Sequence, residues 1–154
     1  MLRGRHAHTV DPKGRIALPK RFRDVLLKKY GSLDVVMTKH LTDPCLVVYP
    51  LAEWERFEQR VADLPQFQKT VKQLRRLYIG CAQDCSADKQ GRLLIPNDLR
   101  SDAELSGEVY WKGQIAFAEL WSSENYVKYV EPVKAQLAVG DLPELEAALE
   151  ELGI

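Results

Sequence analysis

One turn-forming segment occurs twice in the sequence, and this internal repeat limits the folds that the chain can adopt. Residues 8–23 read HTVDPKGRIALPKRFR, and residues 85–100 read CSADKQGRLLIPNDLR. At a constant offset of 77 residues, which is half of the 154-residue chain, an Asp, a Gly, an Arg, a Pro and a later Arg coincide. The apolar positions match as well. We therefore interpret the chain as one unit used twice.

Each copy predicts the same order of short elements. A strand enters a turn at residues 11–14 or 88–91, where Asp in the first position and Gly in the fourth favour a type I turn. A second strand follows, and Pro19 or Pro96 then opens a short helix. β-branched and aromatic residues predict two strand pairs, at residues 33–38 with 45–49 and 108–112 with 116–121.

Apolar residues at helical spacing predict helices that close each copy. The expected ranges are residues 54–64, 65–78 and 126–137. Pro132 should kink or break the last of these helices. Asp141 with Glu144 three residues later is typical of a capping box, which predicts a short acidic helix at the end of the chain. We expect residues 1–77 to form the first repeat with its connecting helix, and residues 78–154 to form the second.

The net charge of zero hides a strong asymmetry along the chain. Residues 1–29 hold nine lysines and arginines against two aspartates, a net charge of +7, whereas residues 131–154 carry −5. Salt screens charges beyond about 8–10 Å, so a basic N-terminal region can bind phosphate whatever the distant acidic tail does.

Other features of the composition bound the class of protein. No apolar run approaches the ~18–20 residues of a membrane span, and the first residues lead into no secretory signal. Three cysteines are a poor basis for a disulfide framework. We expect a cytoplasmic protein that does not bind the membrane.

The repeated Asp-x-x-Gly-Arg turn has a chemistry of its own. Its Asp can accept hydrogen bonds from the N–H groups of the turn and can pair with the Arg four residues later. An Arg that is already oriented loses less entropy when it binds a phosphate or a guanine edge with two hydrogen bonds. The alternative is an internal salt bridge that only locks the turn. Two copies of a basic turn favour the DNA duplex as the ligand.

The candidate residues follow from this interpretation. The turns are organised by Asp11, Gly14, Asp88 and Gly91. The expected DNA-binding residues are Arg3, Arg5, Lys13, Arg15, Lys20, Arg21, Lys89 and Arg92. We expect Lys20 and Arg21 to surround the first turn, with Arg3 and Arg5 close to it. The second turn is less basic because Gln90 replaces Lys13, and Arg92 either contacts DNA or is structural.

The ordered set of motifs resembles the MraZ family of the AbrB/SpoVT-like DNA-binding superfamily over about residues 1–142. The residues that carry the resemblance are Met1-Leu2-Arg3-Gly4, Asp11-x-x-Gly14-Arg15, Pro19, Pro44-Cys45-Leu46, Tyr49-Pro50-Leu51, Glu53-Trp54 and Asp88-x-x-Gly91-Arg92-Leu93-Leu94-Ile95. The family's D-x-x-x-R signature falls on Asp11 and Arg15 and again on Asp88 and Arg92. Leu2 stands where Phe is usual.

The resemblance implies a fold and a function. The implied fold is α+β: a tandem-duplicated swapped-hairpin β-barrel, a pseudo-dimer within one chain, with flanking helices. The implied function is a nucleoid-associated transcriptional regulator that represses the promoter of the division and cell-wall gene cluster. The implied assembly is a closed homo-oligomeric ring that binds short direct repeats in double-stranded DNA.

Three other classes of protein compete with a DNA-binding regulator. An enzyme or metal site would have to use His6 and His8, which alternate on one strand, but no third ligand is near them in sequence. Cys81 and Cys85 have neither redox nor zinc spacing. We therefore predict no enzyme activity, no metal and no cofactor. A ring-forming scaffold and an antitoxin-type DNA binder are the second and third of these classes.

Overall fold

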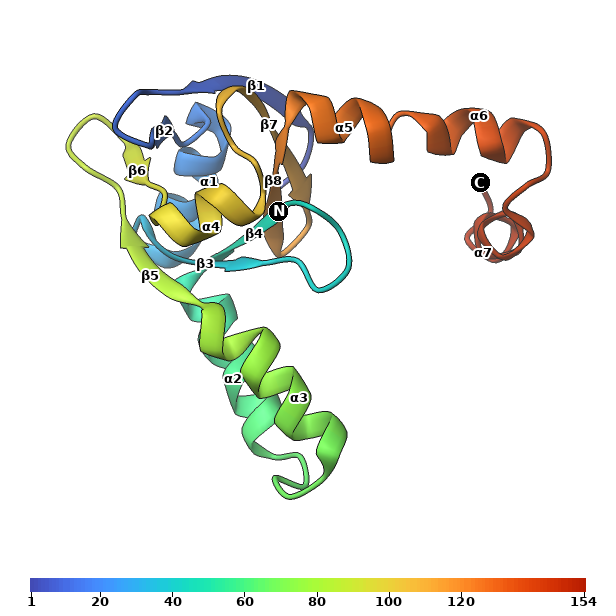
Figure 1. Ribbon diagram of the computed structural model, residues 1–154, viewed down its shortest axis with the longest axis horizontal. Coiled ribbons are helices and arrows are strands. Elements are labelled where there is room, and N and C mark those ends of the chain that lie inside the picture. The colour runs from blue at the N-terminus through green and yellow to red at the C-terminus, as the bar shows by residue number, and fades with distance from the viewer. The chain divides into compact units, whose positions relative to one another are not determined.

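All eight strands of the computed structural model, which describes residues 1–154, lie in the first of two units (Figure 1). This unit is Met1–Ser122, and the second unit is Ser123–Ile154. The strands are β1 Arg5–Val10, β2 Arg15–Ala17, β3 Asp34–Lys39, β4 Leu46–Pro50, β5 Gln83–Ser86, β6 Arg92–Leu94, β7 Gly107–Gln114 and β8 Phe117–Ser122.

The strands form two antiparallel sheets. Six strands are ordered β1-β7-β8-β4-β3-β5, and β2 pairs with β6 in a separate two-stranded ribbon. The predicted pairs β3–β4 and β7–β8 are confirmed. The six-stranded sheet ends at β1 and β5 and does not close on itself, so the expected closed barrel is not confirmed. The observed class is α+β with antiparallel sheets.

Strand pairing crosses between the two sequence copies. β1 of the first copy pairs with β7 of the second, with Arg5 opposite Lys112. β5 of the second copy pairs with β3 of the first. In the ribbon, Ile16 lies opposite its own repeat equivalent, Leu93. Each copy therefore needs strands of the other to complete its hydrogen bonding.

Helices connect the strands of the first unit. They are α1 Lys20–Tyr30, α2 Leu51–Ala62, α3 Lys69–Leu77 and α4 Asn97–Asp102, with a short 3₁₀ turn at Ile79–Cys81. Pro19 and Pro96 are the N-cap residues of α1 and α4, one position before the place expected for them. Gly31 ends α1 with a φ of +68°, a left-handed conformation that glycine adopts without strain.

The second unit consists of helices alone. They are α5 Ser123–Tyr129, α6 Pro132–Ala138 and α7 Pro143–Glu151. Pro132 is the first residue of α6, which confirms the predicted break in the helix. None of the helices in residues 1–154 has both the length and the hydropathy that would allow it to cross a membrane.

Two predicted helix starts are wrong. The residue before α7 is Leu142, no side chain caps this helix, and Pro143 occupies its first turn, so the capping box at Asp141 does not form. The helix expected from residue 65 begins only at Lys69. Phe67 precedes it with 92% of its surface exposed, so this residue does not belong to the apolar stripe of α3.

The core of the first unit combines apolar side chains of both copies. Ile16 and Leu93, on the inner face of the ribbon, are fully buried with Phe22 and Trp111. Trp111 packs edge-on against Phe22, and its indole N–H donates to the Ala17 carbonyl oxygen over 3.1 Å. The core therefore fixes one face of the ribbon and leaves the other face toward solvent.

Candidate nucleic-acid interface

The first turn holds Arg15 through the carboxylate of Asp11. One carboxylate oxygen, Oδ1, accepts the backbone N–H groups of Lys13 and Arg15, both at 2.9 Å. The other oxygen, Oδ2, accepts Nε–H of Arg15 at 2.7 Å. Gly14 closes the turn with an N–H bond of 2.9 Å to the Asp11 carbonyl and a φ of +83°. The guanidinium is thus held by its Nε, and its two terminal NH₂ groups have no hydrogen-bond partner in the protein.

The second turn repeats this geometry with one difference. Asp88 accepts the backbone N–H groups of Gln90 and Arg92 at 2.9 Å and Nε–H of Arg92 at 3.0 Å. The Gln90 side-chain oxygen also accepts Nη2–H of Arg92 at 2.8 Å. Lys13, at the equivalent position of the first turn, has no side-chain acceptor for Arg15. Arg92 therefore has fewer free N–H donors than Arg15.

Both arginines lie on the outer face of the β2–β6 ribbon. Arg15 is opposite Leu94, and Arg92 is opposite Ala17. Alternate residues of a strand share a face, so these four side chains point one way while Ile16 and Leu93 point into the core. The arginine Cα atoms are diagonal neighbours, about 7–8 Å apart. Their side chains are 32% and 31% exposed, so a ligand can reach both.

An arginine from the other sequence copy packs against the glycine of each turn. A Cβ at Gly14 would lie 2.5 Å from Nη1 of Arg100, and a Cβ at Gly91 would lie 2.6 Å from Nη1 of Arg23. Both glycines have a positive φ, +83° at Gly14 and +74° at Gly91, a conformation that residues with a Cβ adopt only with strain. Sequence reasoning missed Arg23 and Arg100 as parts of the site. The one signal in the sequence was that Arg23 and Arg100 occupy equivalent positions in the two copies, 77 residues apart.

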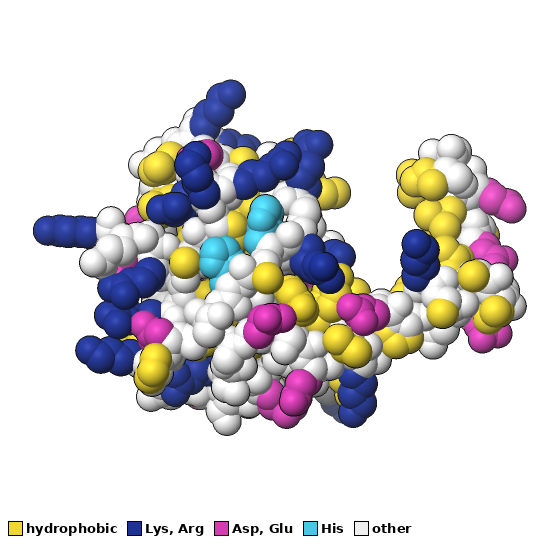
Figure 2. All heavy atoms as spheres, turned by 90° about the horizontal axis from the view of Figure 1, so that it is seen from above, with side chains coloured by type: hydrophobic (Ala, Val, Ile, Leu, Met, Phe, Trp, Pro, Cys, Tyr) yellow, Lys and Arg dark blue, Asp and Glu magenta, His cyan; other side chains and the backbone are white.

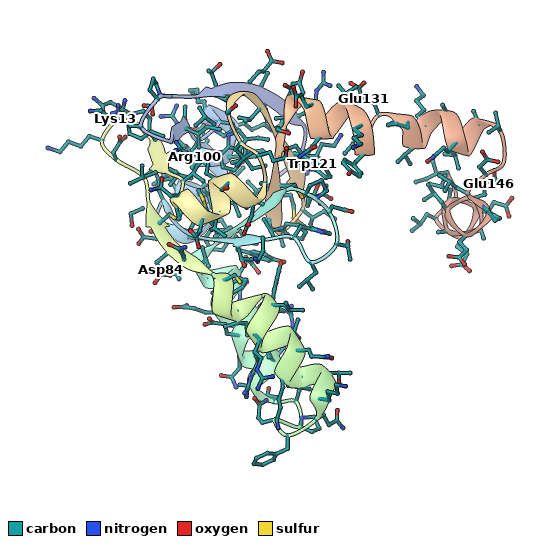
Figure 3. The ribbon with its side chains drawn as sticks, viewed as in Figure 1. Lys13, Asp84, Arg100, Trp121, Glu131 and Glu146 are labelled. Carbon is teal, nitrogen blue, oxygen red and sulfur yellow. The ribbon has the colours of Figure 1, made fainter.

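The exposed cations are distributed differently from the expectation. Lys20, which forms a surface ion pair with Asp24 at 2.9 Å, lines a groove with Asp88 and Lys89 of the second turn. The expectation that Lys20 surrounds the first turn is therefore wrong, because the strand exchange brings α1 to the turn of the other copy. Lys13 and Arg21 are exposed, and Figure 3 shows Lys13 at the outer end of the fold.

The two N-terminal arginines lie away from the turns. Arg3 is exposed in a segment where Leu2 bridges to Ile115. Arg5 starts β1, and its guanidinium lies over the Tyr110 ring at 4.9 Å. The first turn lies at the other end of β1, about 20 Å away at ~3.3 Å per residue. The expected closeness of Arg3 and Arg5 to the turn is therefore wrong. On the face shown in Figure 2, Lys and Arg side chains nevertheless gather along the first unit.

The hydrogen bonds of the turns also shift the acidity of their carboxyl groups. The backbone N–H of Arg15 is the main cause that lowers the pKa of Asp11, and that of Arg92 lowers the pKa of Asp88 in the same way. The arginine side chains act in the same direction, while partial desolvation opposes them. Both carboxylates therefore stay ionised at neutral pH and keep their arginines oriented.

These lowered pKa values predict a specific acid sensitivity. The turns stabilise the fold above the ordinary carboxyl pKa of 3.8, and this stabilisation is lost as the pH falls through the lower pKa of the folded state. Urea unfolding of the wild type should therefore weaken more steeply below about pH 4 than that of an Asp11→Asn, Asp88→Asn variant. Asp84→Asn, an exposed carboxylate without a hydrogen-bond partner, is the control. Equal slopes for all three proteins would contradict the assignment.

The sequence repeat forms two similar α+β units whose strands pair with each other. Each unit presents one arginine that is held by an aspartate, so the protein belongs to a class of duplicated proteins with two arginines on one exposed face. A profile of the family described as "MraZ protein, putative antitoxin-like" matches residues 1–77 and 79–139. The chain therefore belongs to the MraZ family.

Relatives with the name "Transcriptional regulator MraZ" cover most or all of the chain. That of Marinomonas sp. (strain MWYL1) is 42% identical over 142 residues, which are 92% of this chain and 93% of the relative. That of Halothermothrix orenii is 38% identical over the full length of both proteins. That of Pseudomonas aeruginosa (strain LESB58) is 40% identical over 126 residues, which are 82% of this chain and 83% of the relative.

Proposed function

We propose that the protein is a sequence-specific DNA-binding regulator of transcription and that its partner is double-stranded DNA. The observation that carries this proposal is the outer face of the β2–β6 ribbon, where Arg15 and Arg92 are held by carboxylates and remain accessible. A two-stranded ribbon fits the major groove of B-DNA, and an arginine fork binds guanine there with two hydrogen bonds. The name shared by the relatives supports the same function.

The residues divide into two roles in this proposal. Lys13 and Arg15 enter the major groove and contact base edges. Arg92 contributes less, because Gln90 already accepts one of its N–H groups. The other cations hold phosphates along the duplex, and they are Arg3, Arg5, Lys20, Arg21 and Lys89. Arg3 and Arg5 contact phosphates that lie away from the turns, because the length of β1 separates these two arginines from Arg15 and the bases that it contacts.

The same proposal includes the fold relationship and the assembly. Strand exchange between residues 1–77 and 78–154 supports a swapped-hairpin, AbrB/SpoVT-like pseudo-dimer formed by tandem duplication. Single turns bind DNA weakly, at about 10⁻⁴–10⁻⁶ M, and a closed ring of subunits on short direct repeats raises avidity about 10²–10⁴-fold. The target is the promoter of the division and cell-wall gene cluster, where the protein acts as a nucleoid-associated repressor.

A footprint and a salt titration test the proposed function together. Purified protein should protect DNA upstream of its own gene in short, evenly spaced blocks. The logarithm of the affinity should fall linearly with the logarithm of the salt concentration, with a slope of ~0.9 per phosphate contacted. No protection of any duplex would reject DNA as the partner, and affinity without salt dependence would reject the proposed phosphate contacts.

The wording of the family description favours a second candidate, an antitoxin-type DNA binder. DNA binding by the turns is common to both candidates, so the difference lies in a protein partner. A stoichiometric second polypeptide that copurifies from the native host and loses its toxicity on binding would favour the antitoxin. If the protein is a regulator without a toxin partner, the purified, DNA-binding species should contain a single polypeptide.

A further inference from the structure

We propose that Leu94 is a specificity-determining residue that contacts the methyl group of a thymine in the major groove. The inference rests on the proposed DNA-binding function and deepens it, because it assigns a base preference to a side chain that carries no charge. It also predicts that each subunit reads its site in one direction.

Leu94 is a large apolar side chain that the fold directs into solvent. Its neighbours along the chain, Leu93 in β6 and Ile95 just after it, are 0% and 1% exposed, whereas Leu94 is 59% exposed. Since successive residues of a strand point to opposite faces, burial of both neighbours forces Leu94 outward. A leucine with more than half of its surface in water adds little to folding, so the fold itself does not require a leucine at this position.

The surroundings of Leu94 fit a DNA duplex. It lies opposite Arg15 in the ribbon and two residues after Arg92 in its strand. The acidic groups nearest in sequence to these arginines, Asp11 and Asp88, are already occupied by them. One leucine between two guanidinium groups is too small for the core of a protein interface. In the major groove, by contrast, the thymine methyl is the apolar group at the base edges, beside the guanine acceptors that arginine binds.

The ribbon also explains why this contact gives a direction. The ladder is centred on Ile16 and Leu93, which are repeat equivalents, so Arg15 and Arg92 occupy equivalent positions on either side of the centre. Two identical halves would read a palindrome. The repeat equivalent of Leu94 is Ala17, which is three carbons shorter and only partly exposed, so the methyl contact lies on the Leu94 half, next to the base contacted by Arg15.

A base-analogue experiment isolates this contact. Duplexes are first selected from a random pool with wild-type protein, and each thymine of the preferred duplex is then replaced by uracil, which lacks only the methyl group. Replacement at one position should weaken wild-type binding roughly four-fold, the value of one buried methyl group. The same replacement should not affect binding by Leu94→Ala. This variant should bind the original duplex about as weakly as the wild type binds the uracil duplex. Leu41→Ala, at a loop leucine with 52% exposure, is the matched control and should behave as the wild type.

The reverse variant tests the proposed direction. Ala17→Leu should acquire a thymine preference in the other half of the site when it is selected against the same random pool. If Leu94→Ala binds and responds to uracil as the wild type does, the inference is overturned even though DNA binding that depends on Arg15 persists. If the wild type shows no binding that depends on Arg15, the proposed function fails as well. Thermal unfolding of each variant confirms that the fold is intact.

Discussion

Replacing Arg15 with alanine is expected to abolish specific DNA binding and to leave the protein folded. The variant loses an ion pair with Asp11 in which both side chains are about one-third exposed, and such solvent-exposed pairs contribute little to stability. It also loses the proposed bidentate contact of Arg15 with guanine, a kind of contact worth ~1–3 kcal/mol of discrimination. Each subunit of an assembly on repeated sites loses the same contact, so the losses accumulate. Electrophoretic titration of the footprinted duplex, with circular dichroism of the free protein, measures both effects.

Two further variants separate charge from geometry at this position. Arg15→Lys keeps the charge but lacks the planar fork, so it should retain non-specific, salt-dependent binding and lose specificity. Arg76→Ala, an exposed arginine on α3 in the helical pair that projects away from the ribbon (Figure 1), removes the same charge and should bind normally. A folded Arg15→Ala protein with full affinity for the footprinted duplex would count directly against the proposed interface.

Replacing Trp111 with alanine is expected to give the largest loss of stability. The side chain is completely buried, contacts Phe22 and donates its indole N–H to the carbonyl of Ala17. Removal of a buried tryptophan costs about 3–5 kcal/mol, a large part of the ~5–15 kcal/mol that holds a typical domain together. It also leaves a carbonyl of β2 without this partner, directly beneath the proposed DNA-binding face.

Urea unfolding followed by far-ultraviolet circular dichroism measures this loss. Trp111→Phe, which refills most of the cavity but cannot donate the hydrogen bond, should fall between the wild type and Trp111→Ala. An exposed aromatic change, Phe67→Ala, should leave the unfolding midpoint unchanged, since Phe67 is 92% exposed. A Trp111→Ala midpoint equal to that of the wild type would mean that the core does not depend on this residue.

Local elements and the turns could be predicted from the sequence because their determinants are local. The Asp-to-Arg spacing in each turn specifies hydrogen bonds within five residues, and these form in both copies. Helix α1 similarly begins directly after Pro19, as this proline predicts. The membership in the MraZ family follows from motifs over about residues 1–142 and is also confirmed.

The partners of the strands could not be predicted in this way. Period-two patterning marks a strand and its buried face but does not say which strand lies beside it. The pairing of β1 with β7 and of β2 with β6 is decided by packing across the repeat. For the same reason Arg23 and Arg100 escaped notice as parts of the site, because each lies next to a turn that is 68 or 86 residues away in sequence. Asp141 does not cap α7 although it fits a capping pattern, because the helix begins at Pro143, two residues later.

The exchange of strands has a consequence for how the protein is made. β1 finishes its synthesis roughly a hundred residues before β7, and ribosomes add about 5–20 residues per second. For about 5–20 seconds the nascent chain therefore carries β1 with no neighbour to accept its backbone hydrogen bonds. Unpaired edges of this kind are templates for association between chains. Arg5 at the start of β1 and Arg3 just before it place positive charge at this edge, and charged side chains on an edge disfavour pairing with another chain.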